Sequence, residues 1–102
     1  MSRVMLLGDS IRLGYQQTVK ERLAERALVT GPEANCGSSE KLWGMVMGWE
    51  FAVPADVVHV NAGLHDLAVV DRNTGVRRVS LANYQQNLRQ VLHWLLERTE
   101  RR

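Results

Sequence analysis

The sequence predicts a protein of the α/β class, in which a parallel sheet of about three strands lies between two layers of helices. Short apolar runs alternate along the chain with longer segments whose apolar residues recur at helical spacing. Alternation of strands and helices is typical of a parallel sheet with helices on both faces. The length of 102 residues predicts one domain, spanning residues 1–102.

Three apolar runs are the expected strands, near residues 3–8, 27–30 and 56–61. Each ends at a glycine or at a cluster of polar residues, which favours a turn at that point. The first run, Val4–Leu7, is continuous rather than alternating, and Val57–Val60, which His59 interrupts, is a further candidate for a buried strand. Continuous apolar runs predict strands that are buried on both faces.

Three segments have helical spacing. Tyr15, Val19, Leu23 and Ala27 recur every four residues after the first strand, with charged residues between them. The segment from Leu42 to Trp49 predicts only a short or broken helix that Pro54 ends. Glycines at positions 44 and 48 disfavour helix by about 1 kcal/mol each relative to alanine.

The last helix is the most regular pattern in the chain. Ser80 is the residue type that caps helix N-termini, and an apolar stripe from Leu81 to Leu95 follows it. Before it, residues 71–75 read Asp-Arg-Asn-Thr-Gly, which predicts a turn within a loop.

Composition excludes several classes of function. The net charge is only +2 and the basic residues are scattered, so we expect no nucleic-acid partner. The apolar runs are too short for a signal peptide or a membrane span, and Cys36 is the single cysteine, so a reduced cytoplasmic setting is expected. His59, His65, Asp66 and His93 lack the spacing of metal ligands, and no nucleotide-binding motif occurs. We therefore expect neither metal nor cofactor.

Ser10 lies where the first strand passes into the first helix. Ligands of open parallel sheets bind beyond the carboxyl ends of the strands, so this position suits an active site. A hydroxyl beside the free N–H groups of a helix N-terminus suits attack on a carbonyl whose oxygen becomes an anion. Two readings stay open, because serine also caps helices and Asp9 is either a loop-ordering or a reactive carboxylate.

Three blocks in order, each after an expected strand, resemble the SGNH (GDSL-type) hydrolases. Gly8-Asp9-Ser10-Ile11 is similar to the first block, Gly37 to the glycine of the second, and Gly63-Leu64-His65-Asp66 to the third, G-x-N-D. Histidine stands where most of the family carries asparagine. The resemblance implies a flavodoxin-like three-layer α/β/α fold with strand order 2-1-3.

The resemblance also implies an activity and a role for each matching residue. Ser10 would be the nucleophile of a serine ester hydrolase. The backbone N–H groups of Ser10 and Gly37 and the ring N–H of His65 would form the oxyanion hole, with Asp9 and Asp66 as supporting residues. The substrate would be a small ester. The family acts on acetylated sugars, lipids and thioesters, and Trp43, Trp49 and Trp94 are candidates to line a sugar site.

The chain departs from the family in one respect. No D-x-x-H block, which supplies the family's catalytic base, follows the third expected strand. We therefore expect the N-terminal half of an ester hydrolase, inactive or nearly so alone. The alternatives are a non-catalytic remnant that serves as a small-ligand or protein-interaction module, and a minimal enzyme in which His65 or another local group is the base.

The missing half would leave the edge of the strand at 56–61 without a partner. That stretch holds no lysine, glutamate or proline of the kind that protects sheet edges. We expect the chain to form a homodimer through this edge or to bind a complementing C-terminal half there.

Overall fold

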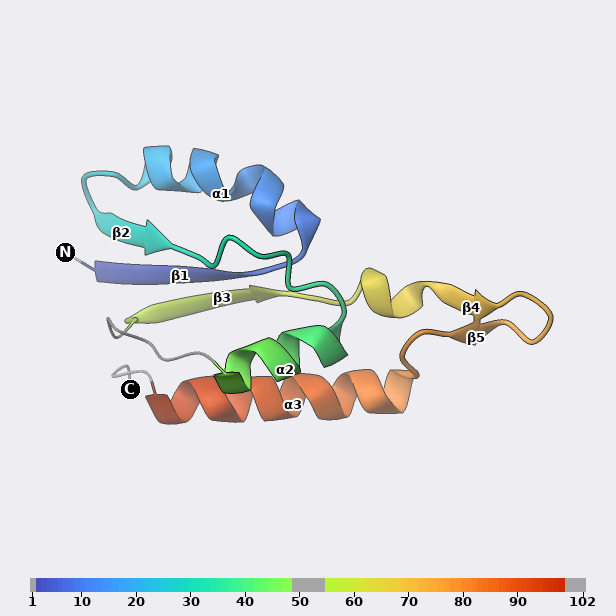
Figure 1. The fold of residues 1–102 in the computed structure, drawn as a ribbon. Helices are drawn as coiled ribbons and strands as arrows, with labels where there is room; N and C mark the ends of the chain where they lie inside the picture. Colours follow the sequence, from blue (N-terminus) through green and yellow to red (C-terminus); the bar gives the residue numbers. More distant parts are fainter. Residues whose placement is uncertain (1, 49–54, 99–102) are drawn as a thin grey trace.

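Three parallel strands form the central sheet of the molecule, which is a computed structural model that describes residues 2–48 and 55–98 (Figure 1). The strands are β1 (Ser2–Gly8), β2 (Ala27–Thr30) and β3 (Val57–Asn61), in the order β2-β1-β3. Val4 of β1 pairs with Val29 on one side and with Val57 on the other. The predicted strand order 2-1-3 and the three strand positions are confirmed.

Helices cover both faces of this sheet. The helix α1 (Ser10–Arg22) lies on one face, and α2 (Ser39–Gly48) and α3 (Leu81–Arg98) lie on the other (Figure 1). Neighbouring strand residues point to opposite faces. Leu6 of β1 therefore belongs to the core beneath α1, whereas Leu7 belongs to the core formed with α2 and α3.

The expected helices are present with small differences. The middle segment is a short, continuous helix of ten residues in spite of Gly44. Pro54 and Trp49 lie outside the described residues, so the predicted end of this helix at Pro54 is not described. Ser80 caps α3 as predicted, because its Oγ accepts a hydrogen bond of 3.2 Å from the Asn83 N–H.

The prediction of a third strand buried on both faces is wrong. None of the five residues of β3 is buried, and Val57 is 53% exposed. The reason is topological: β1 has a neighbour on each side, whereas β3 lies at the edge of the sheet and is only partly covered by the helices.

The structure contains a β-hairpin around residues 71–75, where the sequence predicts only a turn. The strands β4 (Val69–Asp71) and β5 (Val76–Arg77) pair antiparallel after a short 3₁₀ helix, η1 (His65–Leu67). The hairpin extends away from the sheet, beyond the carboxyl ends of the strands (Figure 1). Its strands are too short to give an apolar pattern, and pairing across the turn holds them together.

Among the described helices, none combines the length and the apolar character needed to cross a membrane.

Candidate active site

Each of the three matched blocks lies in the segment that follows the carboxyl end of a strand. Ser10 follows β1, and its block is tied to the second block because the Cys36 N–H donates a hydrogen bond of 3.0 Å to the Gly8 carbonyl oxygen. Gly8 also pairs with Asn61, the last residue of β3, from which the chain runs on to His65. The structure therefore places Ser10, Gly37 and His65 in three segments at one edge of the sheet, as the sequence predicts.

Gly8 is the point of closest approach between these segments. A Cβ atom at position 8 would lie 2.7 Å from the Arg12 Cβ and 2.9 Å from the Asn61 carbonyl oxygen. Both distances are shorter than any normal contact, and one involves rigid backbone. Only glycine therefore lets β1, α1 and the end of β3 meet in this way.

Asp9, rather than Ser10, is the N-cap of α1. Its Oδ1 accepts a hydrogen bond of 2.9 Å from the Ile11 N–H. Asp9 is fully buried, and its Oδ2 has no partner among the described residues. Ser10 is the first helical residue, is exposed, and its hydroxyl makes no hydrogen bond within the described part of the chain. The capping explanation for Ser10 is therefore wrong, and its hydroxyl stays available.

Gly37 has a backbone that a side chain would strain. Its φ angle of 62° is in the left-handed region, and an added Cβ would lie 2.9 Å from the Lys41 Cδ. The Gly37 N–H donates a hydrogen bond of 2.8 Å to the Asn35 Oδ1. A substrate oxygen bound by this N–H would therefore take the place of the Asn35 side chain.

His65 and Asp66 begin η1 but have different surroundings. The His65 ring is half-buried and makes no hydrogen bond to another described residue. Asp66 is buried, and its carboxylate accepts hydrogen bonds from the Ser39 N–H at 2.7 Å and from the Ser39 hydroxyl. The Asn87 side chain donates to the same hydroxyl at 3.1 Å, so this network joins η1 to the start of α2 and to α3.

Arg12 is the residue that sequence reasoning missed. Its side chain is fully buried, and its guanidinium donates to the carbonyl oxygens of Pro32 and Ala34 at 2.7 Å each and to that of Gly8 at 3.2 Å. It thereby fastens the segment before Gly37 to the end of β1. The helical pattern gave no signal for it, because the four-residue spacing of Tyr15, Val19 and Leu23, continued back, reaches Ile11 rather than Arg12.

None of the described histidines is hydrogen-bonded to the Ser10 hydroxyl. The letters D-x-x-H occur once, at Asp56–His59, but within and just before β3 rather than after it. The Asp56 Oδ2 accepts a hydrogen bond of 2.8 Å from the Arg3 N–H at the amino end of the sheet, and the His59 Nδ1 lies 3.5 Å from the Tyr15 hydroxyl. His93 is exposed on α3.

Metal chemistry has no evident site in the described residues, where no three histidine, cysteine or carboxylate side chains form a group that could hold an ion. Comparison with protein-family models finds no match, and comparison with curated proteins finds none either. The resemblance to the SGNH hydrolases therefore depends on the three sequence blocks alone.

Proposed function

We propose that this chain is the nucleophile-bearing part of an SGNH-type serine ester hydrolase, with Ser10 as the nucleophile. The observation that carries the proposal is the state of Ser10. Its hydroxyl is exposed and without a hydrogen bond at the first position of α1, while Asp9 takes the capping role. A serine that only stabilised the helix would be bonded to the helix N-terminus itself.

The same edge offers donors for a developing oxyanion. The N–H groups at the start of α1 point outward from the helix and favour negative charge. The Gly37 N–H and the unbonded ring of half-buried His65 are the two further donors in the proposal. Preorganised donors of this kind are worth about 10²–10³ each in turnover.

Activation of Ser10 requires a base, and no described residue is hydrogen-bonded to its hydroxyl as a base would be. Serine is a weak nucleophile without an adjacent base. In the proposal, a histidine and its carboxylate partner come from a second chain or from a complementing segment. Loss of such members of a catalytic triad lowers turnover by roughly 10⁴–10⁶, so the chain alone should hydrolyse p-nitrophenyl acetate very slowly.

The open edge of β3 is where the proposal places the second chain. A groove of about 280 Å³ runs between this edge and α3, lined by valines of β3 and by Leu92, Leu95 and Leu96. Leu92 and Leu96 are 49% and 70% exposed. The same surface favours the second candidate function, a protein-interaction module without catalysis. Neither candidate needs nucleic acid or a membrane, and both fit a cytoplasmic protein.

Covalent labelling tests the role of Ser10 separately from turnover. The chain is treated with a p-nitrophenyl alkylphosphonate, with and without imidazole as an external base, and the modified residue is located by mass spectrometry. We expect labelling of Ser10 that increases with imidazole. Ser80 is the matched internal control, because it is also an exposed serine at a helix start but accepts a hydrogen bond as the cap of α3.

Three variants complete the test. Ser10→Ala should abolish the imidazole-dependent adduct, and Ser80→Ala should leave it unchanged. His65→Ala should slow labelling by about 10-fold or more, because one oxyanion donor is lost. Equal labelling of Ser10 and Ser80, in the presence of imidazole, would favour the non-catalytic module instead.

A further inference from the structure

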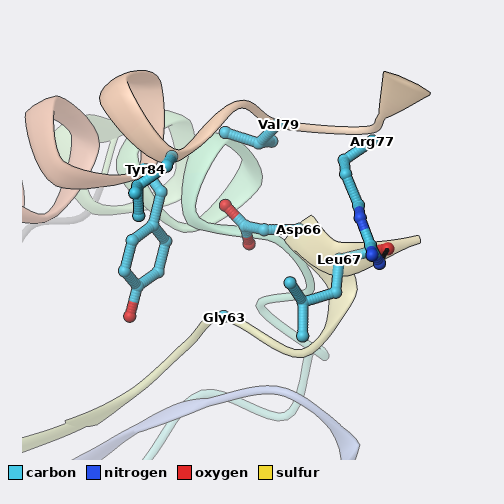
Figure 2. Close-up of a pocket in the computed structure, with 7 residues that line it drawn as sticks. Gly63, Asp66, Leu67, Arg77, Val79 and Tyr84 are labelled. Carbon is cyan, nitrogen blue, oxygen red and sulfur yellow. Dashed lines mark hydrogen bonds between the residues drawn. The ribbon is translucent and has the colours of Figure 1, made fainter. Parts of the chain in front are cut away.

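A pocket of about 510 Å³ lies between η1, β5 and the start of α3. Figure 2 shows Leu67, Val79 and Tyr84 around it, with Asp66 between them. Its size is within the range of pockets that hold small molecules, which is roughly 300–1,000 Å³. Leu81, which is 73% exposed, also lines it. The walls are therefore mainly hydrocarbon.

The polar groups of this pocket are already bonded inside the protein. The Tyr84 hydroxyl donates a hydrogen bond of 3.1 Å to the Ala62 carbonyl oxygen, and both carboxylate oxygens of Asp66 accept from Ser39. The Arg77 Nη1 donates to the Leu67 carbonyl oxygen at 2.7 Å. Asp66 and Arg77 carry opposite charges, so the lining has no net charge with which to select an ion.

A hydroxyl-rich ligand fits this surface poorly. Sugars need several polar partners, whereas Tyr84 and Asp66 already bond inside the protein and only the remaining N–H groups of Arg77 are left to donate. The two described tryptophans among those considered for sugar stacking do not line the pocket. Trp43 and Trp94 pack edge to face with ring centroids 6.2 Å apart and contact the hydrophobic core, and Trp49 lies outside the described residues.

The pocket shares a short segment with the proposed site. Gly63 and Asp66 both line it, and His65, the proposed oxyanion donor, lies between them in the sequence. We infer that the pocket binds an uncharged, straight aliphatic chain of the ester substrate, in preference to an acetylated sugar. This inference rests on the proposed function, and it narrows the substrate class to aliphatic esters.

Binding, rather than turnover, tests the inference. Methyl butyrate, methyl hexanoate and methyl octanoate are titrated into ¹⁵N-labelled protein, and amide chemical shifts report both affinity and place. Each added methylene that is buried should tighten binding by about fourfold. The shifted signals should include Gly63, Leu67, Val79 and Leu81. Glucose pentaacetate is the competing probe and should bind more weakly than methyl octanoate.

Two leucines of nearly equal exposure give a matched pair of variants. Leu81→Asp places a charge in the pocket wall and should weaken binding of methyl octanoate by about 10-fold or more. Leu96 is 70% exposed on the same helix but lies in the other groove, so Leu96→Asp should leave the affinity unchanged. Both positions are exposed, so neither change should unfold the protein.

The outcomes separate this inference from the proposed function. Affinity independent of chain length, tighter binding of the sugar acetate, or shifts confined to the groove beside β3 would each overturn the aliphatic pocket, whatever the labelling of Ser10. Binding that depends on chain length and shifts the Leu81 signal, without labelling of Ser10, would support the aliphatic pocket. It would contradict the proposed hydrolase function.

Discussion

The carboxyl edge of the sheet and the outer edge of β3 differ in which side chains are buried. At the carboxyl edge, charged side chains are buried: Asp9, Arg12 and Asp66 are at most 3% exposed. At the outer edge, apolar side chains are exposed, with Val57 and Leu96 at 53% and 70%. In the first region the buried charged groups bond within the chain, apart from the Asp9 Oδ2, whereas the second has apolar side chains that a partner would cover.

Two adjacent residues show how local geometry produces this difference. Ile11 is 48% exposed, whereas Arg12 beside it is fully buried. The helix directs position 12 toward Gly8 and the loop that follows β2, where backbone carbonyl groups need donors. A guanidinium has five N–H groups in a planar fork and meets several acceptors at once, which no apolar residue does.

The largest expected effect in the buried polar region comes from Arg12→Met. The substitution removes the side-chain donor of the part-buried Pro32 and Ala34 carbonyl groups and one of the two donors of the Gly8 carbonyl oxygen, which keeps the Cys36 N–H. Hydrogen bonds to charged groups contribute about 1.5–3 kcal/mol each. We expect the free energy of unfolding to fall by about 3 kcal/mol or more, measured by urea denaturation followed by circular dichroism. Arg22→Met, at an exposed position of the same helix, is the control and should change stability by less than about 0.5 kcal/mol. A similar loss of stability in both variants would mean that the Arg12 side chain does not stabilise the contact between α1 and the loop after β2.

The second effect is that of Asp66→Ala. The buried Ser39 N–H and hydroxyl lose their acceptor, and hydrogen bonds to charged groups contribute about 1.5–3 kcal/mol. We expect a loss of about 2–3 kcal/mol in thermal or urea unfolding. Asp71→Ala removes an exposed carboxylate bonded only within the hairpin turn, to the Asn73 N–H, and should cost less than about 1 kcal/mol. A larger loss for Asp71 would contradict the network around Ser39.

The third comparison is between neighbours at the start of α1. Asp9→Ala removes the N-cap and should lower the free energy of unfolding by about 1 kcal/mol. Ser10→Ala removes a hydroxyl without a hydrogen bond and should stay within about 0.5 kcal/mol of the parent protein. Chemical denaturation of the two variants side by side measures the difference. A stability loss at Ser10 equal to that at Asp9 would restore the capping role and weaken the case for a nucleophile.

Substitutions at the sheet edges should change stability least but should change self-association strongly. Val57→Lys on β3 should change the free energy of unfolding by less than about 1 kcal/mol and should abolish self-association, since lysine blocks strand pairing at an edge. Leu28→Lys is the matched control, because Leu28 is 49% exposed on β2, the opposite edge strand.

Size-exclusion chromatography with light scattering measures this effect. The parent chain should elute above the monomer mass of 11.6 kDa at micromolar concentration, and Val57→Lys should shift it to the monomer. A parent protein that is already a monomer would exclude the homodimer and leave a separate complementing chain as the partner.

The sequence by itself determined the elements whose residues are regular over several turns or a whole strand. The three strands and the cap at Ser80 follow from apolar runs and from one side chain that bonds its own helix, whereas the strand order 2-1-3 was what the resemblance to the SGNH hydrolases implied. It also located the three segments at the carboxyl edge, because parallel strands joined by helices bring their carboxyl ends to one side. These features depend on contacts close in the chain or on handedness common to all such sheets.

Tertiary structure alone decided the features that depend on distant neighbours. Asp9 rather than Ser10 caps α1, Arg12 is buried while Ile11 is not, and the apolar residues of β3 stay at least partly exposed. None of these follows from the polarity of the residue itself. The buried guanidinium of Arg12 needs carbonyl groups 20 and 22 positions away, and the burial of a strand depends on how many neighbours the topology gives it.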